Sequence, residues 1–169
     1  METYNTILQR RSIRKFTDQA VSNDIIQQLL KAAMAAPSAC NKRPWEFYVI
    51  KNNELQSQLK KSSKFAGMNS NVIIIVAGNT NNSLSKKDND FWIQDCSAAV
   101  ENILLVATEN NIGTCWCGLY PNKLAANRVR KILNIENHII PMALIHLGYP
   151  AEEKESRTQF EESKVHIYE

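Results

Sequence analysis

Val72-Ile73-Ile74-Ile75-Val76-Ala77 is an uninterrupted run of apolar residues near the middle of the chain. The run is short, rich in β-branched residues and without polar alternation. This pattern is typical of a strand that is buried on both faces. Other elements must therefore cover the strand on both sides, and the sequence around it supplies candidates.

Strand character recurs at residues 45–50, 114–118 and 141–149, with residues 165–168 as a candidate final strand. Helical spacing of apolar residues predicts helices at 3–9, 23–36, 52–65, 90–110 and 122–133, with polar loops at 37–45 and 79–89. Ser22 and Asn122 are the predicted N-caps of their helices. Helix 90–110 is apolar around much of its circumference, which is typical of a helix in a core or an interface. No two-residue hairpin is evident, so the residues alone predict an α+β or a mixed α/β fold.

Composition limits the class of protein. The 169 residues predict one domain, 1–169, with 44% hydrophobic and 22% charged residues, as in ordinary globular proteins. A net charge of +3 without a basic stripe argues against nucleic acid as a partner. No apolar run reaches the length of a membrane span, so no membrane association is expected. Four cysteines without a secretory signal predict reduced thiols and a cytoplasmic location.

A dense basic motif lies near the amino terminus. Arg10-Arg11-Ser12-Ile13-Arg14 is followed by Lys15, which places four cations and a hydroxyl within six residues. The planar guanidinium group suits phosphate because it donates two parallel hydrogen bonds. The motif is therefore either a phosphate site or an exposed cluster of charges in solvent.

Four stretches resemble the nitroreductase family of flavin mononucleotide (FMN) oxidoreductases. They occur in the family's order and spacing: Arg10-Arg11-Ser12-Ile13-Arg14, Ala36-Pro37-Ser38-Ala39-Cys40-Asn41-Lys42-Arg43-Pro44-Trp45-Glu46-Phe47, Asn111-Ile112-Gly113-Thr114-Cys115-Trp116-Cys117-Gly118 and His146-Leu147-Gly148-Tyr149-Pro150-Ala151-Glu152-Glu153-Lys154. The resemblance implies an α+β, nitroreductase-like fold, in which helices flank a mixed, mainly antiparallel sheet. It also implies a homodimer with FMN at the subunit interface, helix 90–110 in the dimer core and the C-terminal strand exchanged onto the partner.

The resemblance also implies roles for individual residues. Arg10, Arg11 and Ser12 are expected at the FMN phosphate and ribityl chain, and Arg14 at the pyrimidine edge. The loop residues Pro37, Ser38, Ala39 and Asn41 are expected to reach the flavin of the other subunit. The backbone of Cys117 and Gly118 should face the ring near N5, and Arg157, with Lys154, should close over the phosphate.

This cofactor would carry the chemistry, and the protein would bind it, orient it and tune its potential. NADH or NADPH would donate hydride, and a nitroaromatic, quinone or similar small acceptor would take it in a ping-pong mechanism. No Gly-x-Gly-x-x-Gly motif is present, which fits a nicotinamide that binds only briefly. Because reduced flavin tends to carry negative charge at N1, Arg14 is expected to raise the flavin potential.

Several residues allow other interpretations. Cys115-x-Cys117 could be half of a zinc site, but no second pair stands at ligand spacing, so buried thiols facing one side of a strand are expected and no metal. Cys40 and Cys117 are candidates for a redox role. Trp45 and Trp116 are expected in the core, whereas Phe91 or Trp92 is a candidate substrate contact.

The function also has alternatives. A family member with a narrower task, such as enone reduction, dehalogenation or an oxidation, would carry the same motifs. A flavin-storing dimer with little turnover, or a small basic nucleic-acid-associated protein, would be of a different class.

Overall fold

The computed structural model describes residues 2–84 and 90–169. The helices and strands, in chain order, are α1 (Thr3–Gln9), α2 (Asn23–Met34), the 3₁₀ turn η1 (Ala39–Asn41), β1 (Trp45–Ile50), α3 (Asn53–Leu59), β2 (Val72–Asn79), α4 (Phe91–Glu109), β3 (Gly113–Gly118), α5 (Lys123–Ile132), β4 (Ile139–Gly148) and η2 (Glu162–Lys164). The predicted loop 79–89 lies partly outside the described residues.

The four strands form one sheet in the order β1-β2-β4-β3, and all three neighbouring pairs are antiparallel. The α+β prediction is therefore confirmed. Every residue of β2 is buried, as its apolar run predicts. Within the described residues, parallel pairing is limited to an isolated bridge between Ser12 and Thr114.

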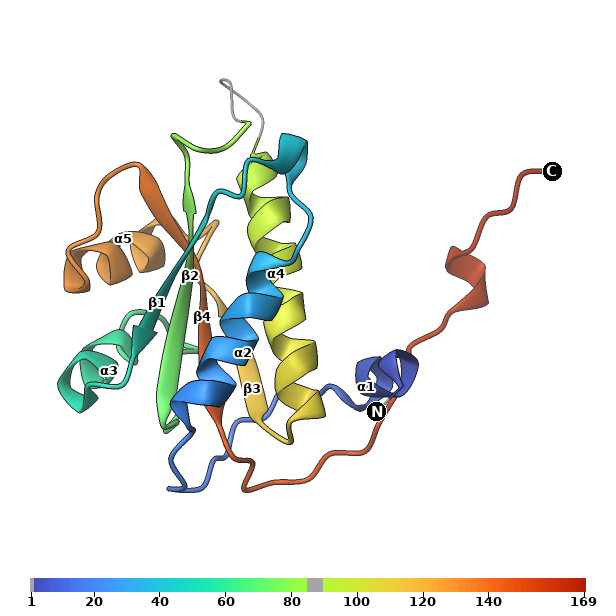
Figure 1. The fold of residues 1–169 in the computed structure, drawn as a ribbon, viewed down its shortest axis with the longest axis horizontal. Coiled ribbons are helices and arrows are strands. Elements are labelled where there is room, and N and C mark those ends of the chain that lie inside the picture. The colour runs from blue at the N-terminus through green and yellow to red at the C-terminus, as the bar shows by residue number, and fades with distance from the viewer. Residues whose placement is uncertain (1, 85–89) are drawn as a thin grey trace.

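Helices cover both faces of the sheet (Figure 1). On one face α2 and α4 pack against alternate β2 side chains such as Ile74 and Val76. On the other face α3 and α5 pack against the intervening residues, among them Ile73 and Ile75. This division is the physical reason for an unbroken apolar run, because both faces of β2 must be apolar.

Helix α3 is shorter than predicted. It ends at Leu59, and residues 60–71 form a loop instead of continuing to Phe65. Tertiary contacts hold this loop: the Ala66 carbonyl oxygen lies 3.1 Å from His146 Nε2, and the Phe65 carbonyl accepts from Cys117 Sγ at 3.1 Å. These contacts fix the chain after Leu59 against β3 and β4, so tertiary contacts override local helix propensity here.

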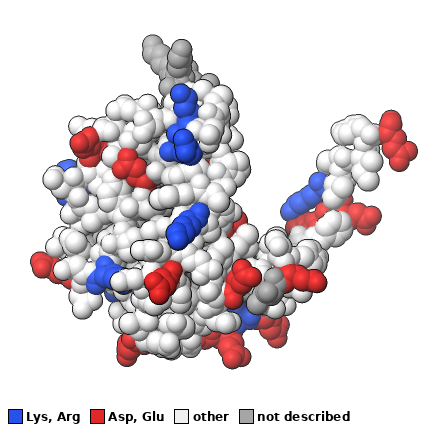
Figure 2. Space-filling model, viewed as in Figure 1, with Lys and Arg blue, Asp and Glu red and all other residues white. Residues whose placement is uncertain are grey.

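The C-terminal segment extends away from the body of the molecule (Figures 1 and 2). Residues 165–168 form no strand within the single chain, and their exchange onto a partner subunit stays a prediction. A strand needs a neighbouring strand to satisfy its peptide groups, and none of the described residues lies beside this segment to provide one. On the face seen in Figure 2, basic and acidic side chains are interspersed over the body. No helix in the described ranges has the length and apolarity required to cross a bilayer.

Candidate functional site

The basic motif is held along the outer edge of β3. The Ile13 N–H donates to the Thr114 carbonyl oxygen at 2.8 Å, and Ser12 forms the parallel bridge with Thr114. The Ile13 side chain covers Gly113 so closely that a Cβ on this glycine would lie 2.9 Å from Ile13 Cγ2. The glycine therefore allows the motif to lie flat against the strand.

Arg10 and Ser12 line a cavity of about 450 Å³ on the α4 side of the sheet. Its other walls come from α4, β3 and β4 and include Glu101, Trp116, Gly118 and Met142. Arg10 Nε lies 3.5 Å from Glu101 Oε1, so a carboxylate of α4 orients this guanidinium. Glu101 was not among the predicted site residues, although a charge within an apolar helix was a signal for it.

Arg14 lines a second cavity, of about 440 Å³, on the opposite side of the sheet. Lys64, Phe65 and Met68 of the 60–71 loop form one wall, and Cys115 and Cys117 form another. The two cavities share Trp116 and Gly118. The cations of one short motif are thus divided between the two sides of β3.

Trp116 lies between the two cavities and is 37% exposed, so the prediction of a core position is wrong for this residue. Its place on the outermost strand, with a neighbour on only one side, explains the exposure. Trp45 is buried as predicted. Trp92 is buried and packs edge-on against Tyr120 at a centroid distance of 5.0 Å. A ring enclosed in this way is not available to a substrate, so of the two candidate contacts only the half-buried Phe91 stays a prediction.

The outer edge of β3 is open beyond Thr114. Because successive residues of a strand direct their peptide groups to opposite sides, Trp116 and Gly118 have theirs on the same side as Thr114, away from β4. The Cys117 peptide group faces β4 instead, and its side chain lines the second cavity. At this open edge Gly118 presents its backbone outward, as expected, whereas Cys117 presents its side chain to the second cavity and not its peptide group.

The two thiols of β3 lie on one face, as predicted, and both line the second cavity. The neighbouring Cys117 thiol, together with the positive charge of Arg14, lowers the pKa of Cys115 to about 7. The neighbouring Cys115 thiol and burial raise the pKa of Cys117. No cluster of three or more His, Cys, Asp or Glu side chains with metal-binding arrangement occurs among the described residues.

Residues 151–157 run back past the motif. Lys154 Nζ donates to the Ser12 carbonyl oxygen at 2.8 Å and lies 3.4 Å from Glu152 Oε1. Glu152 Oε1 accepts the backbone N–H groups of Arg14 and Lys15. The hydrogen bond from the Arg14 backbone lowers the pKa of Glu152, which was not predicted as a site residue.

The remaining basic residues of this region are held by backbone groups. Arg11 donates to the Glu155 carbonyl oxygen, and the Arg157 N–H donates to the Leu8 carbonyl oxygen at 3.1 Å. Residues 154–157, distant in sequence, are thus held beside the motif and the end of α1.

The loop with Pro37, Ser38, Ala39 and Asn41 lies at the other end of α4 from the motif (Figure 1). Of the described residues that line the two cavities, none comes from this loop. The Ala39 N–H donates to Asp95 Oδ1 on α4 at 2.9 Å. Within one chain, the structure therefore does not bring the loop together with the basic motif.

Comparison with known proteins is consistent with this geometry. The nitroreductase family model matches residues 7–66 and 55–149. A protein of Archaeoglobus fulgidus that carries the designation NADH dehydrogenase/NAD(P)H nitroreductase is 39% identical over 170 residues, which cover 98% of this chain and 97% of that protein. A solved structure from Parabacteroides distasonis with the same designation has a TM-score of 0.91 and 34% identity over 98% of this chain and 96% of that one.

A further solved structure, a nitroreductase from Desulfovibrio desulfuricans in complex with FMN, has a TM-score of 0.83 and 28% identity over 99% of this chain and 98% of that one. The family match covers most of the chain, and the structural similarity extends over almost all of it. The chain therefore belongs to the nitroreductase family of oxidoreductases.

Proposed function

We propose that the protein is an FMN-dependent oxidoreductase that takes hydride from NADH or NADPH and reduces nitroaromatic, quinone or similar small acceptors. The observation that carries this proposal is the arrangement at the open edge of β3, where Arg10 and Ser12 line one cavity and Arg14 the other. Bound FMN would supply the redox-active ring. Donor and acceptor would occupy the same space in turn, which gives ping-pong kinetics.

The residues present fit such a cofactor. A phosphate dianion needs several cations, and Arg10, Arg11, Lys154 and Arg157 all lie in or beside the motif. The polar edge of a flavin needs hydrogen-bonding groups, and the outward peptide groups of Trp116 and Gly118 are available for this role. In this assignment Ser12 binds near the ribityl chain, Arg14 faces the pyrimidine edge, and Cys117 and Gly118 lie along the ring.

We also propose that the working form is a homodimer. Pro37, Ser38, Ala39 and Asn41 would then reach the flavin bound mainly by the other subunit, because they do not line the cavities of their own. The exposed apolar side chains of the C-terminal tail, Phe160, Val165, Ile167 and Tyr168, would be covered by the partner, with residues 165–168 exchanged as a strand.

Titration of the apoprotein with FMN tests the proposal, followed by anaerobic addition of NADH or NADPH. We expect one FMN per chain and bleaching of the flavin absorbance by at least one nicotinamide. Arg10→Ala should weaken FMN binding, whereas Arg130→Ala, which removes a cation of α5 outside the two cavities, should not. Parallel double-reciprocal plots are expected with an added quinone or nitroaromatic acceptor. Absence of FMN uptake by the wild-type chain would contradict the proposal.

A further inference from the structure

Asp95 is a buried carboxylate that the basic motif does not use. It lies in the second turn of α4 and is 5% exposed. Oδ1 accepts the Ala39 N–H, but Oδ2 is buried and has no hydrogen-bond partner among the described residues. A buried carboxylate with half of its hydrogen-bonding capacity unused is a poor source of stability, because desolvation offsets much of what its bond contributes. Its presence points to a role other than holding the fold together.

The segment that Asp95 holds is conformationally constrained. Cys40, Asn41 and Arg43 have φ values of 50°, 53° and 48°, so three non-glycine residues within four positions adopt left-handed backbone conformations. Such conformations persist only where surrounding contacts enforce them, and they are typical of segments that position a ligand. Within the loop, Ser38 Oγ accepts the Arg43 N–H at 2.9 Å.

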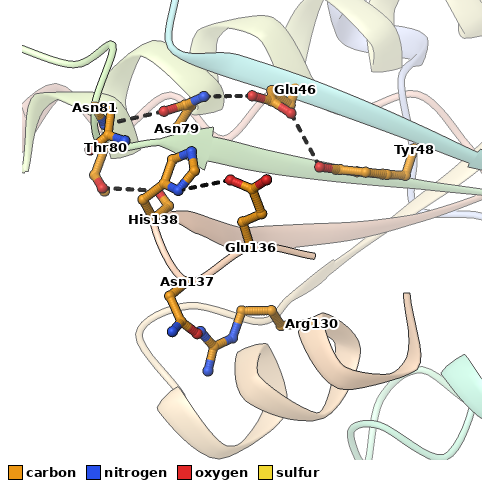
Figure 3. Close-up of polar contacts among 9 residues, drawn as sticks. All are labelled: Glu46, Tyr48, Asn79, Thr80, Asn81, Arg130, Glu136, Asn137 and His138. Atoms are coloured by element: carbon orange, nitrogen blue, oxygen red, sulfur yellow. Dashed lines mark hydrogen bonds and ion pairs between the residues drawn. The ribbon is translucent and has the colours of Figure 1, made fainter. Parts of the chain in front are cut away.

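The far end of the loop is anchored separately. The Asn79 N–H donates to the Pro44 carbonyl oxygen at 2.7 Å, and the Asn79 side chain donates to Glu46 Oε1 at 2.6 Å, a contact seen in Figure 3. Tyr48 donates to the other oxygen of the same carboxylate at 3.1 Å. With the exit fixed to β2 in this way, the entrance to the loop depends on the contact between Asp95 and Ala39.

We infer that Asp95 is a positioning residue that sets the shape in which residues 38–41 meet the FMN of the partner subunit. This inference rests on the proposed function, in which the loop acts on the partner's site. Asp95 therefore acts through Ala39 and does not itself touch the cofactor. Substitution of Asp95 should therefore change the FMN affinity of the other subunit's site more than the free energy of unfolding of its own subunit.

The first test compares Asp95→Leu and Asp95→Asn in the full chain by FMN titration of the apoproteins. Asp95→Leu removes the acceptor and should weaken FMN binding about tenfold or more, as expected for a hydrogen bond to a charged group. Asp95→Asn keeps an acceptor for the Ala39 N–H and should bind FMN closer to wild type. Asn122→Ala is the matched control, because Asn122 Oδ1 also accepts backbone N–H groups but lies at the start of α5, outside the two cavities. It should lower the free energy of unfolding without changing FMN affinity.

The second test asks on which subunit Asp95 acts. The test uses a heterodimer of one Asp95→Leu subunit and one Arg10→Ala subunit, purified through two different affinity tags. If the loop acts on the partner, this heterodimer contains one site with both an intact motif and an intact loop. It should bind one FMN per dimer with wild-type affinity. If Asp95 acts within its own subunit, neither site is intact and affinity stays low.

Wild-type affinity in the Asp95→Leu homodimer, or a heterodimer without restored binding, would overturn the inference and leave the proposed function standing. If Asp95→Leu does not fold, Asp95→Ala, which also removes the acceptor of the Ala39 N–H, replaces it in both tests. Wild-type affinity in its homodimer, or no restored binding in its heterodimer with Arg10→Ala, would overturn the inference. Failure of the wild-type chain to bind FMN would contradict both the proposed function and this inference.

Discussion

At the scale of the residue, neighbouring side chains of one motif face different surroundings. Arg10 pairs with Glu101 in the cavity beside α4, whereas Arg14 lies across β3 with two thiols and Lys64. The backbone bond from Ile13 to Thr114 sets this division, because it fixes the strand edge that the motif crosses. In the proposed function, this division lets Arg10 serve the phosphate and Arg14 the ring.

Arg14→Ala should lower the midpoint potential of bound FMN. A cation about 4 Å from a negative charge contributes about 4 kcal/mol at an effective dielectric of about 20. If a quarter to a half of this survives desolvation, the effect is roughly 1–2 kcal/mol, or about 20–45 mV for a two-electron couple. Spectroelectrochemical titration measures the shift, with Arg14→Lys as the variant that keeps the charge. An unchanged or higher potential in Arg14→Ala would exclude this role.

At the scale of the element, the 60–71 loop owes its position to strands β3 and β4. His146 is fully buried, and its Nε2 faces the Ala66 carbonyl, which can only accept a hydrogen bond. Nε2 therefore carries the proton, and Nδ1 accepts from the Ser70 hydroxyl at 2.7 Å. This neutral imidazole closes the loop that walls the Arg14 cavity, which makes it a structural determinant of the cavity's shape.

Burial lowers the pKa of His146 from 6.5 to about 4, and this shift predicts a pH dependence of stability. Between those values the unfolded chain binds the proton that the folded chain excludes, so stability falls as pH falls through the window and is fully present above it. The loss between pH 7 and pH 5 should be about 2 kcal/mol. Urea unfolding at both values should show this loss in wild type and a smaller one in His146→Gln. Equal losses in the two proteins would contradict the assignment.

Helix α5 provides a test of local capping. Asn122 Oδ1 accepts the N–H groups of Leu124 and Ala125 at 3.1 and 3.2 Å, as the sequence predicted for an N-cap. Asn122→Ala should reduce the free energy of unfolding by about 1 kcal/mol, because two first-turn donors lose their acceptor. Asn122→Asp keeps the acceptor and should remain near wild type in the same denaturant titration. A loss of equal size in both variants would point to a role other than capping.

At the scale of the whole molecule, the C-terminal tail extends away from the body of its own chain (Figure 1). The Arg157 N–H contact with Leu8 is followed by a tail whose Tyr168 is 94% exposed. Exposed apolar side chains in this position contribute little to the stability of the single chain, because their apolar surface is not removed from water. In the proposed homodimer, the partner subunit would cover these side chains.

Deletion of residues 158–169 should leave the fold intact and weaken the proposed dimer. The buried core residues lie between Val21 and Leu147 in the chain and include none of the deleted residues. Sedimentation at several protein concentrations measures the assembly, and circular dichroism measures the fold. Replacing Phe160, Ile167 and Tyr168 together by Ser should act in the same direction without shortening the chain. An unaltered dimer in both variants would show that another surface holds the subunits.

Local signals in the sequence determined the positions of the four strands and the five helices, and of the caps Ser22 and Asn122. The reason is that the burial pattern and side-chain capping each depend on only a few neighbouring residues. The cationic motif was also visible in the sequence, because a dense group of guanidinium groups needs an anion or solvent. Tertiary structure alone decided where α3 ends, which side of β3 each arginine faces, and that Asp95 holds Ala39. These outcomes depend on contacts between residues far apart in sequence, and no local pattern specifies which distant group will satisfy a given carbonyl, carboxylate or cation.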